Sequence, residues 1–483
     1  MDSATVRTLQ IRELLRAVLL ELRGIWVLKG DPTILKCPLV NRLWESESRR
    51  VIWENCVAAN RSYKEPRIGD LIAMDQQRRQ RYANHIRSLV SGNRLDRSTG
   101  FQDNQFQLES AGVSFPHLRE LVIRDLGWIN QHLYKPVNAL EPYLQPRLRI
   151  LSIFNYYILD PLIISDELLN ALSARSRSLE CLDIRTSSIH FTASESTVTK
   201  FCGDMKCLTR LSWDVGCKKL SSPEAFLSMS QMPRLQTLQV HGIDSDWVDL
   251  LEPNAFPALQ HLKCSISSHG LEQLLKVLPD LRSLKFHPTS GSGSGNIMEI
   301  CSRANLGQLR VLKLLTDPRT AYGMHESIRI LYRGEVLQRM ESHNRTEPFL
   351  VNLNDSIMLD LAKRLPKLEE MKILLRGSQL TEQSLISLGT QCPNLRRCWL
   401  AAEVDIKNFI DKMSPDTFPS LETLGIYRSS RVDDTTMTAS DLDSLAQEML
   451  ETMPLLQSTD LQGWPRFTHT LQDLVNRNSS DED

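Results

Sequence analysis

The sequence predicts an α/β fold in which strand–helix units stack into a right-handed solenoid behind a small N-terminal all-helical module. The first observation is the pattern L-x-x-L-x-L, which recurs along most of the chain after a Pro or a short polar turn. The second is the helical period of the stretch before several copies, as in residues 165–179, 270–281 and 360–368. One strand and one helix cannot enclose a core, so the units must stack to bury a continuous one.

The repeat recurs in twelve copies. Within a copy the last two apolar positions are two residues apart, which places both side chains on one face of a strand. Most neighbouring copies are 22–31 residues apart, and a recurring period in that range indicates a repeat architecture. The first leucines of the copies are Leu118, Leu148, Leu179, Leu208, Leu235, Leu259, Leu281, Leu309, Leu368, Leu395, Leu421 and Leu456.

The repeats resemble the leucine-rich-repeat family, and its helical subtype in particular. Residues 380–400, LTEQSLISLGTQCPNLRRCWL, are similar to the cysteine-containing repeat of many F-box proteins. The resemblance covers residues 110–465 and implies a horseshoe whose inner strand face binds partners. Leu309 and Leu368 are much farther apart than other neighbouring copies. The polar segment near 315–360 is therefore either a degenerate repeat or an insertion loop.

The first sixty residues carry two apolar patterns of helical period. The second pattern contains the motif L-x-C-x-x-V-x-x-x-W and a further Trp nine residues on. Considered alone, the segment predicts a helical cap that covers one end of the stacked units. The first pattern consists of Leu14, Leu15, Val18, Leu19 and Leu22, and the second motif of Leu35, Cys37, Val40, Trp44 and Trp53.

The order of these elements also resembles the F-box, although Gln10–Glu13 stand where the family usually opens with Leu-Pro. F-boxes bind a Skp-type adaptor, and the resemblance implies the same partner here, with a cullin bound through it. Residues 1–60 form the predicted F-box-like module. The residues expected to hold it together and to contact the adaptor are Leu14, Leu15, Val18, Leu22, Leu35, Cys37, Val40, Trp44 and Trp53.

Two further segments complete the predicted domains. Residues 61–109 are charged and are expected to connect the module to the repeats, with an edge strand at His85–Gly92 that starts the solenoid. The arginines near residue 80 are expected to lie on a solvated helix face. Residues 466–483 form a polar, acidic tail, and its last part, NRNSSDED, is expected to be disordered.

Composition narrows the classes of function. The net charge is −1, so no global field favours nucleic acid or a membrane as partner. No run of eighteen apolar residues is present, and Arg12, Glu13 and Arg16 interrupt the N-terminal apolar stretch where a signal peptide would be apolar. We therefore expect a cytoplasmic or nuclear protein whose ten cysteines are reduced.

No motif in the sequence points to catalysis. The run SGSGSG at 290–295 is followed by no Lys-Ser/Thr and reads as a flexible loop. Cys202, Cys207 and Cys217 lack a C-x-x-C pair, which argues against zinc. No G-x-S-x-G elbow occurs. We expect no catalytic residue, metal or cofactor, and hence a binding protein rather than an enzyme.

The predicted binding site is the strand face that points away from the buried leucines. In the central copies this face carries Lys and His without acidic residues, and an aromatic pair follows. Such a stripe suits an acidic or phosphorylated protein segment, although polar strand faces also cluster by chance. The candidate substrate-binding residues are His261, Lys263, Lys285, His287, Lys313, Lys372, Arg397, Trp399 and Tyr427.

Two functions are compatible with these patterns. The first is the substrate-recognition subunit of a cullin-RING (SCF-type) ubiquitin ligase, which binds the adaptor through its N-terminal helices and a protein substrate on the concave repeat face. The second is a stand-alone repeat scaffold or inhibitor, resembling the ribonuclease-inhibitor type, with the N-terminal segment acting only as a cap. Binding to the adaptor separates the two.

Overall fold

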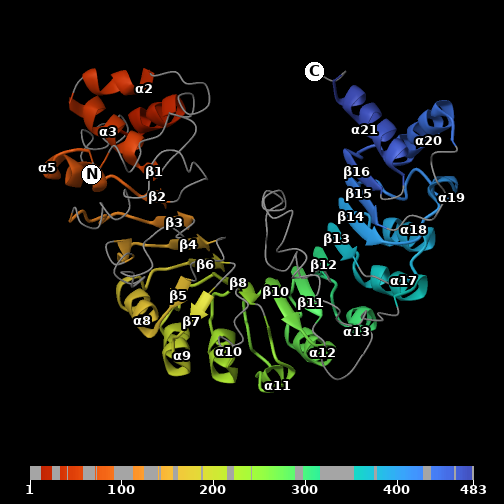
Figure 1. Ribbon diagram of the computed structural model, residues 1–483, viewed down its shortest axis with the longest axis horizontal. Coiled ribbons are helices and arrows are strands. Elements are labelled where there is room, and N and C mark those ends of the chain that lie inside the picture. The colour runs from red at the N-terminus through yellow and green to blue at the C-terminus, as the bar shows by residue number, and fades with distance from the viewer. Residues whose placement is uncertain are drawn as a thin grey trace, which may run out of the picture. The chain divides into compact units, whose positions relative to one another are not determined.

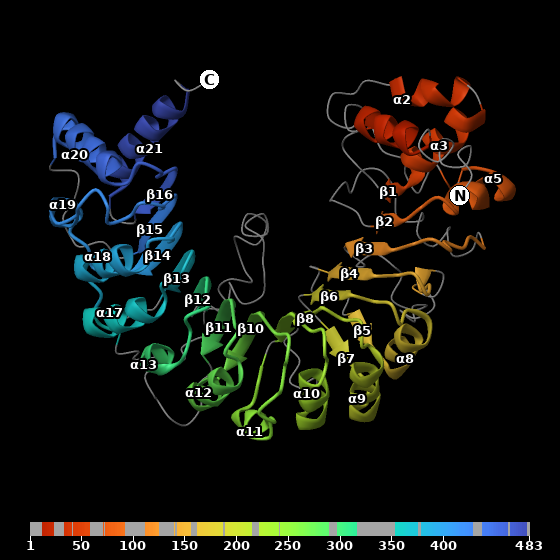
Figure 2. The same cartoon turned by 180° about the vertical axis from the view of Figure 1, so that it is seen from behind.

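The computed structural model describes most of the repeats and part of the N-terminal segment. The chain divides into two compact units, Met1–Leu235 and Gln236–Asp483. In each unit, parallel strands form a sheet, and the helices of the repeats lie along one side of it (Figures 1 and 2). The described residues are 12–23, 33–40, 42–57, 71, 73–91, 112–124, 140, 143–155, 162–186, 189–214, 222–240, 242–288, 297–315, 353–374, 378–427, 437–461 and 464–480.

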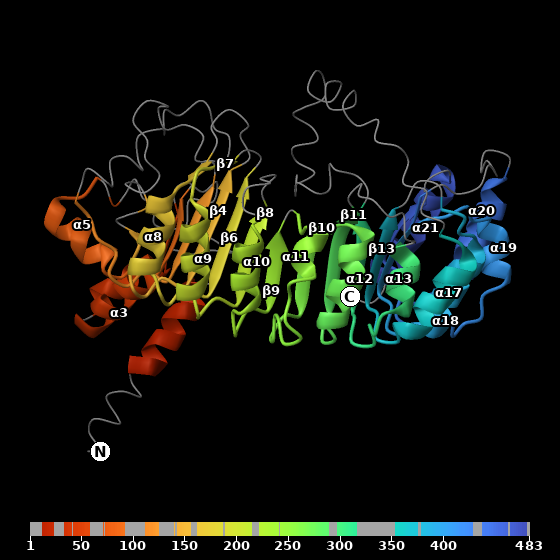
Figure 3. The ribbon, with the colours of Figure 1, turned by 90° about the horizontal axis from the view of Figure 1, so that it is seen from below.

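In the first unit, residues 12–23 are helical and precede a sheet of strand order β1-β2-β3-β4-β6-β8. Figure 3 shows α8, α9 and α10 side by side along one side of this sheet. The elements are α2 (Thr33–Lys36), the 3-10 turn η1 (Cys37–Leu39), α3 (Arg42–Trp53), β1 (Asn55–Val57), α5 (Gln76–Ala83), β2 (Ser88–Ser91), β3 (Glu120–Arg124), β4 (Ile150–Asn155), β5 (Leu162–Ile164), α8 (Asp166–Arg175), β6 (Cys181–Thr186), β7 (Ile189–Phe191), α9 (Glu195–Asp204), β8 (Arg210–Asp214) and α10 (Pro223–Ser230).

The second unit continues the alternation of strand and helix, with its strands in sequence order in the sheet. Its elements are β9 (Thr237–Val240), α11 (Ser245–Val248), β10 (His261–Ile266), α12 (Ser268–Val277), β11 (Ser283–Pro288), α13 (Ile297–Arg303), β12 (Val311–Leu315), α17 (Asp355–Arg364), β13 (Glu370–Leu374), α18 (Glu382–Gln391), β14 (Arg397–Ala401), α19 (Ile406–Asp411), β15 (Thr423–Tyr427), α20 (Ala439–Thr452), β16 (Ser458–Leu461) and α21 (Pro465–Ser480).

The leucine pattern occupies the predicted positions. Leu121, Leu151 and Leu182 are fully buried and pair in register from β3 to β4 to β6. Leu238 is 1% exposed and pairs with Leu262 of β10. The first leucine of every copy is at most 4% exposed. The predicted core and parallel strands are therefore confirmed, and the structure is a leucine-rich-repeat-like fold.

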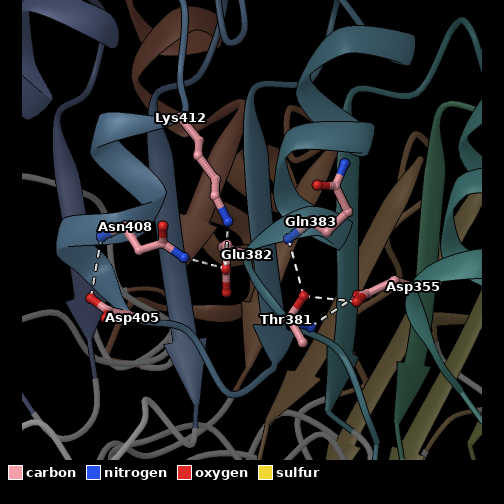
Figure 4. Close-up of polar contacts among 7 residues, drawn as sticks. All are labelled: Asp355, Thr381, Glu382, Gln383, Asp405, Asn408 and Lys412. Atoms are coloured by element: carbon pink, nitrogen blue, oxygen red, sulfur yellow. Dashed lines mark hydrogen bonds and ion pairs between the residues drawn. The ribbon is translucent and has the colours of Figure 1, made fainter.

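Most of the described repeat helices begin at a side-chain cap. In two helix pairs, the first-turn Asp of one helix also accepts hydrogen bonds from the cap residue of the next helix. Thr381, the N-cap of α18, donates its N–H and hydroxyl to Asp355 of α17 at 2.9 and 2.7 Å (Figure 4). Ser194, the N-cap of α9, donates in the same way to Asp166 of α8 at 2.6 and 2.9 Å. Because these bonds form only when the two helices are in register, they fix the phase of neighbouring repeats.

A second ladder shows that the sheet begins earlier than predicted. The carbonyl of Glu54 accepts from the N–H groups of Arg87 and Ser88, at 2.8 and 3.0 Å. The carbonyls of Arg87 and Arg119, just before the following strands, each accept two backbone N–H groups in the same way. β1 and β2 therefore belong to the repeat sheet, although the repeats were expected to start near residue 110. The predicted strand at 85–92 exists as β2, but it is flanked by β1 and β3 and is not an edge strand.

Two other predictions change. The tail expected from residue 466 is largely α21, whose Phe467 and Leu471 are fully buried. The residues after Asn476 are polar and did not indicate a helix in the sequence. The helix is stabilised by apolar side chains on one face, in its earlier turns. Residues 316–352 lie outside the described residues, as do 289–296. β12 pairs directly with β13, so no strand from the 315–360 segment enters the sheet between them.

Candidate functional site

The N-terminal helix is held against α3 by charged as well as apolar side chains. Arg12 contacts the buried carboxylate of Glu47 at 2.8 Å, and Arg16 contacts Glu54 at 3.1 Å. Leu15 and Leu19 are 6% and 0% exposed on the same helix. Arg12 and Arg16, which interrupt the apolar pattern in the sequence, thus help to attach this helix to α3 and to Glu54 just after it.

The N-terminal segment also exposes apolar side chains. Six of the eight large apolar side chains that are exposed among the described residues lie between residues 14 and 40. Leu14 and Val18 are four residues apart in one helix and share a face. Exposed apolar groups in such concentration mark an interaction surface. We call these six residues the N-terminal apolar surface: Leu14 (66% exposed), Val18 (50%), Leu20 (43%), Leu35 (48%), Leu39 (85%) and Val40 (59%).

The predicted adaptor-binding residues divide between this surface and the interior. Leu14, Val18, Leu35 and Val40 are exposed, and Leu22 and Trp44 are half-buried. The other three are buried and contribute to folding. Trp53 is one of them and stacks on Tyr82 of α5 with ring centroids 4.9 Å apart, so it attaches α3 to α5 rather than facing a partner. The remaining two are Leu15 and Cys37, at 6% and 4% exposure.

The second candidate site is the strand face of the second unit. Strand pairing places Lys263 of β10 beside Lys285 of β11, and Lys285 beside Lys313 of β12. Lys372 of β13 follows Lys313 in the same row. The sheet therefore brings together four lysines from separate repeats, as the sequence predicted. His261 and His287 lie in the two flanking rows, opposite Ser283 and Ser265.

Glu370 is the residue of this face that sequence reasoning missed. It is 7% exposed, and its carboxylate forms ion pairs with Lys313 and with Arg397, the latter at 3.2 Å. Burial acts to raise the pKa of Glu370, but hydrogen bonds and charges from Lys313 and Arg397 outweigh it, so the pKa lies below its ordinary value. An acidic group of the chain itself thus compensates part of the predicted stripe. The sequence did contain a signal for Glu370, because residues two apart in a strand point to the same face and Glu370 lies two residues before Lys372.

The aromatic end of this face is shaped by a glycine. Trp399 of β14 pairs with Gly425 of β15, and a Cβ at Gly425 would come within 2.1 Å of Trp399 Cδ1. The indole ring therefore lies over the glycine. Lys372 Nζ is 5.7 Å from the ring centroid of Trp399, a cation–π distance. Beyond it, the hydroxyl of Tyr427 donates to Asp460 Oδ2 at 2.8 Å.

Neither site has the make-up of a metal centre. Within the ranges that the structure describes, no group of three or more His, Cys, Asp or Glu side chains is arranged to hold a metal ion. The described helices also include none that is long and apolar enough to cross a membrane. Burial raises the pKa of the Cys202, Cys264 and Cys301 thiols to about 12, so these cysteines act as core residues.

Comparison with known proteins gives matches to structures alone. No family model and no curated protein matches the chain. A crystal structure of the Rad7 and Elc1 complex in yeast is 13% identical, covers 96% of this chain and 95% of the other, and has a TM-score of 0.39. The TLR13–ssRNA13 complex is 17% identical, covers 71% of this chain and 42% of the other, and has a TM-score of 0.35. The LRR ectodomain of the receptor kinase GASSHO1/SCHENGEN3 from Arabidopsis thaliana, in complex with CASPARIAN STRIP INTEGRITY FACTOR 2, is 14% identical, covers 80% of this chain and 40% of the other, and has a TM-score of 0.32.

Proposed function

We propose that the protein is a non-catalytic substrate receptor of a cullin-RING (SCF-type) ubiquitin ligase. The N-terminal segment binds a Skp-type adaptor, and through it a cullin, while the strand face of the repeats binds a protein substrate. The observation that carries the proposal is the N-terminal apolar surface. It coincides with the segment whose order of helices and motif L-x-C-x-x-V-x-x-x-W resemble the F-box.

The energetics favour a partner at this surface. Burial of apolar area contributes about 25 cal/mol per Å², so a partner that covers exposed side chains of this set gains free energy from each of them. The ion pairs of Arg12 and Arg16 hold the helix from its opposite side. Leu14 and Val18 are therefore presented by a helix that is already placed, which lowers the ordering cost of binding.

The test uses point substitutions, because deletion of residues 1–60 would also remove β1 from the sheet. Val18→Glu and Leu39→Glu each place a charge on an exposed position, so folding is retained. Capture of a purified Skp-type adaptor by the full chain is then measured by calorimetry or pull-down. We expect each variant to weaken binding at least tenfold, a loss of about 1.4 kcal/mol.

Leu250→Glu is the matched control, because Leu250 is 55% exposed but belongs to the second unit. It should bind the adaptor as the wild type does. If the wild type fails to bind the adaptor, or if all three variants bind equally well, the F-box assignment is wrong. The stand-alone repeat scaffold then becomes the better description.

A further inference from the structure

The turns just before β2, β3 and β4 carry a row of arginines in the first unit. The carbonyl of Arg87 accepts from the N–H of Arg119 at 2.7 Å, and the carbonyl of Arg119 accepts from the N–H of Arg149 at 2.7 Å. The three residues are therefore neighbours across adjacent turns, about 4.8 Å apart. Carboxylates bound this arginine row, because Glu54 precedes Arg87 and Glu180 follows Arg149 in the same ladder.

Arg119 differs from the other two members of the row because both of its neighbours are basic. Arg87 contacts Glu54 at 3.4 Å, and Arg149 contacts Glu180 at 3.2 Å, so each end arginine has a carboxylate in the adjacent turn. Arg119 is exposed, and among the residues that the structure describes none forms an ion pair with it. Its positive charge is therefore available to an anionic partner from outside the chain.

A second exposed basic pair lies beside the row. His117 is two residues before Arg119 on the exposed side of the same turn, and Arg147 occupies the equivalent position in the next turn. Arg147 Nη1 is 2.8 Å from His117 Nδ1. A guanidinium only donates, so His117 accepts with an unprotonated nitrogen and leaves the charge of Arg147 uncompensated.

The electrostatics of His117 report how many positive charges converge here. Partial burial lowers the pKa of His117, and nearby positive charges lower it further. These charges belong to Arg147, Arg87, Arg50 and Arg119. The turns before β3 and β4 thus form a local concentration of positive charge, although the net charge of the whole chain is −1.

We propose that Arg119 and Arg147, with His117 between them, bind a phosphoserine or phosphothreonine side chain of a partner protein. Guanidinium groups present planar forks of N–H donors that match phosphate oxygens. Arg149 adds a third guanidinium, because an exposed ion pair such as the one with Glu180 contributes little and can be exchanged. The inference goes beyond the proposed function, since it does not depend on an adaptor.

The surroundings favour a single phosphate group over a nucleic acid or a carboxylate. Glu54 and Glu180 limit the arginine row to three turns, about 10 Å, and further phosphates of a nucleic acid would meet these carboxylates. Proteins that bind single strands also stack bases on exposed aromatic rings, whereas Phe115 and Tyr143, just before these turns, are buried. A phosphoserine carries a charge of about −1.5 to −2, which compensates two arginines where one carboxylate compensates only one.

The test measures binding of fluorescein-labelled probes to the full-length protein by anisotropy. The first probe is a short Gly-Ser peptide with one central phosphoserine. Its counterparts carry serine or glutamate at the same position, so that charge and phosphate geometry are varied separately. A single-stranded oligouridylate serves as the nucleic-acid probe.

We expect the phosphoserine peptide to bind more tightly than each of the other probes, by about fivefold or more. Arg119→Gln combined with Arg147→Gln should abolish its advantage over the serine peptide. Arg119→Lys keeps the charge but removes the fork, so it should retain only part of the advantage. The substituted side chains are exposed, so the midpoint of thermal unfolding should be unchanged.

Arg282→Gln is the matched control. Arg282 is an exposed arginine just before β11, and it follows Gln260 and precedes Arg310 in the corresponding ladder of the second unit. It therefore occupies the same position in its repeat but lacks basic neighbours on both sides. The Arg282→Gln protein should bind the phosphoserine peptide as the wild type does.

Equal binding of the phosphoserine and serine peptides would overturn the proposal, as would equal binding of the phosphoserine peptide by the double variant and the wild type. Tighter binding of the glutamate peptide or of the oligouridylate would overturn it in favour of those ligands. Adaptor capture by the same variants is measured separately and should be unchanged. Loss of the F-box assignment and loss of this inference are therefore distinguishable.

Discussion

Two glycines at similar positions of repeat helices should respond oppositely to the same substitution. Gly203 is near the end of α9, and a Cβ there would meet nothing within 4 Å. Gly389 is near the end of α18, and a Cβ there would come within 2.5 Å of the carbonyl oxygen of Thr417 and 2.8 Å of Phe418 Cζ. Alanine in a helix is favoured over glycine by about 0.5–1 kcal/mol, so Gly203→Ala should stabilise the protein by that amount.

For Gly389→Ala the same gain is opposed by overpacking. Such insertions cost about 1–3 kcal/mol, and a backbone oxygen cannot rotate away as a side chain does. The expected net effect is a destabilisation of about 1–2 kcal/mol, confined to α18 and its neighbours. Hydrogen exchange of the α18 amides measures this locally, which suits a repeat protein that does not unfold as one unit. A Gly389→Ala protein with wild-type or slower exchange would refute the argument from close approach.

Three further substitutions test the core and the strand face. Leu238→Asp places an unpaired carboxylate in the core, which costs about 3–5 kcal/mol, and should abolish the cooperative thermal transition seen by circular dichroism, whereas a retained transition would contradict the assigned burial. Thr459→Val should raise the free energy of unfolding by about 1 kcal/mol, because the buried hydroxyl of Thr459 has no hydrogen-bond partner. An unchanged midpoint of thermal unfolding would count against this. Glu370→Gln should destabilise the second unit by about 1–2 kcal/mol at neutral pH, less than a fully buried pair because Arg397 is half-exposed. Because the pKa of Glu370 is lowered in the folded state, the stabilisation from its ion pairs is complete above the ordinary pKa of 4.5 and is lost as the pH falls through the lower folded-state pKa. The free energies of unfolding of the wild type and Glu370→Gln should therefore converge in acid. A difference in stability that persists in acid would contradict the ion pairs.

The sequence by itself determined the phase and the core of the repeats. Alternation along a strand and the helical period before it are local properties, so they can be read from one copy and strengthened by recurrence. Leu121 and Leu238 are buried at the positions that this pattern indicated. The row of lysines was also predictable, because equivalent positions of successive copies become neighbours once the units stack.

Only the tertiary structure decided which charges and apolar groups face each other. Leu14 and Leu15 are adjacent in an apolar pattern, yet one is exposed and the other buried, because α3 covers a single side of the helix. Glu370 neutralises part of the strand face although residues 316–352 separate it from Lys313 in the sequence. Periodicity defines the face on which a side chain lies. The partner that it meets there depends on which elements stack against it, and stacking brings together residues that are distant along the chain.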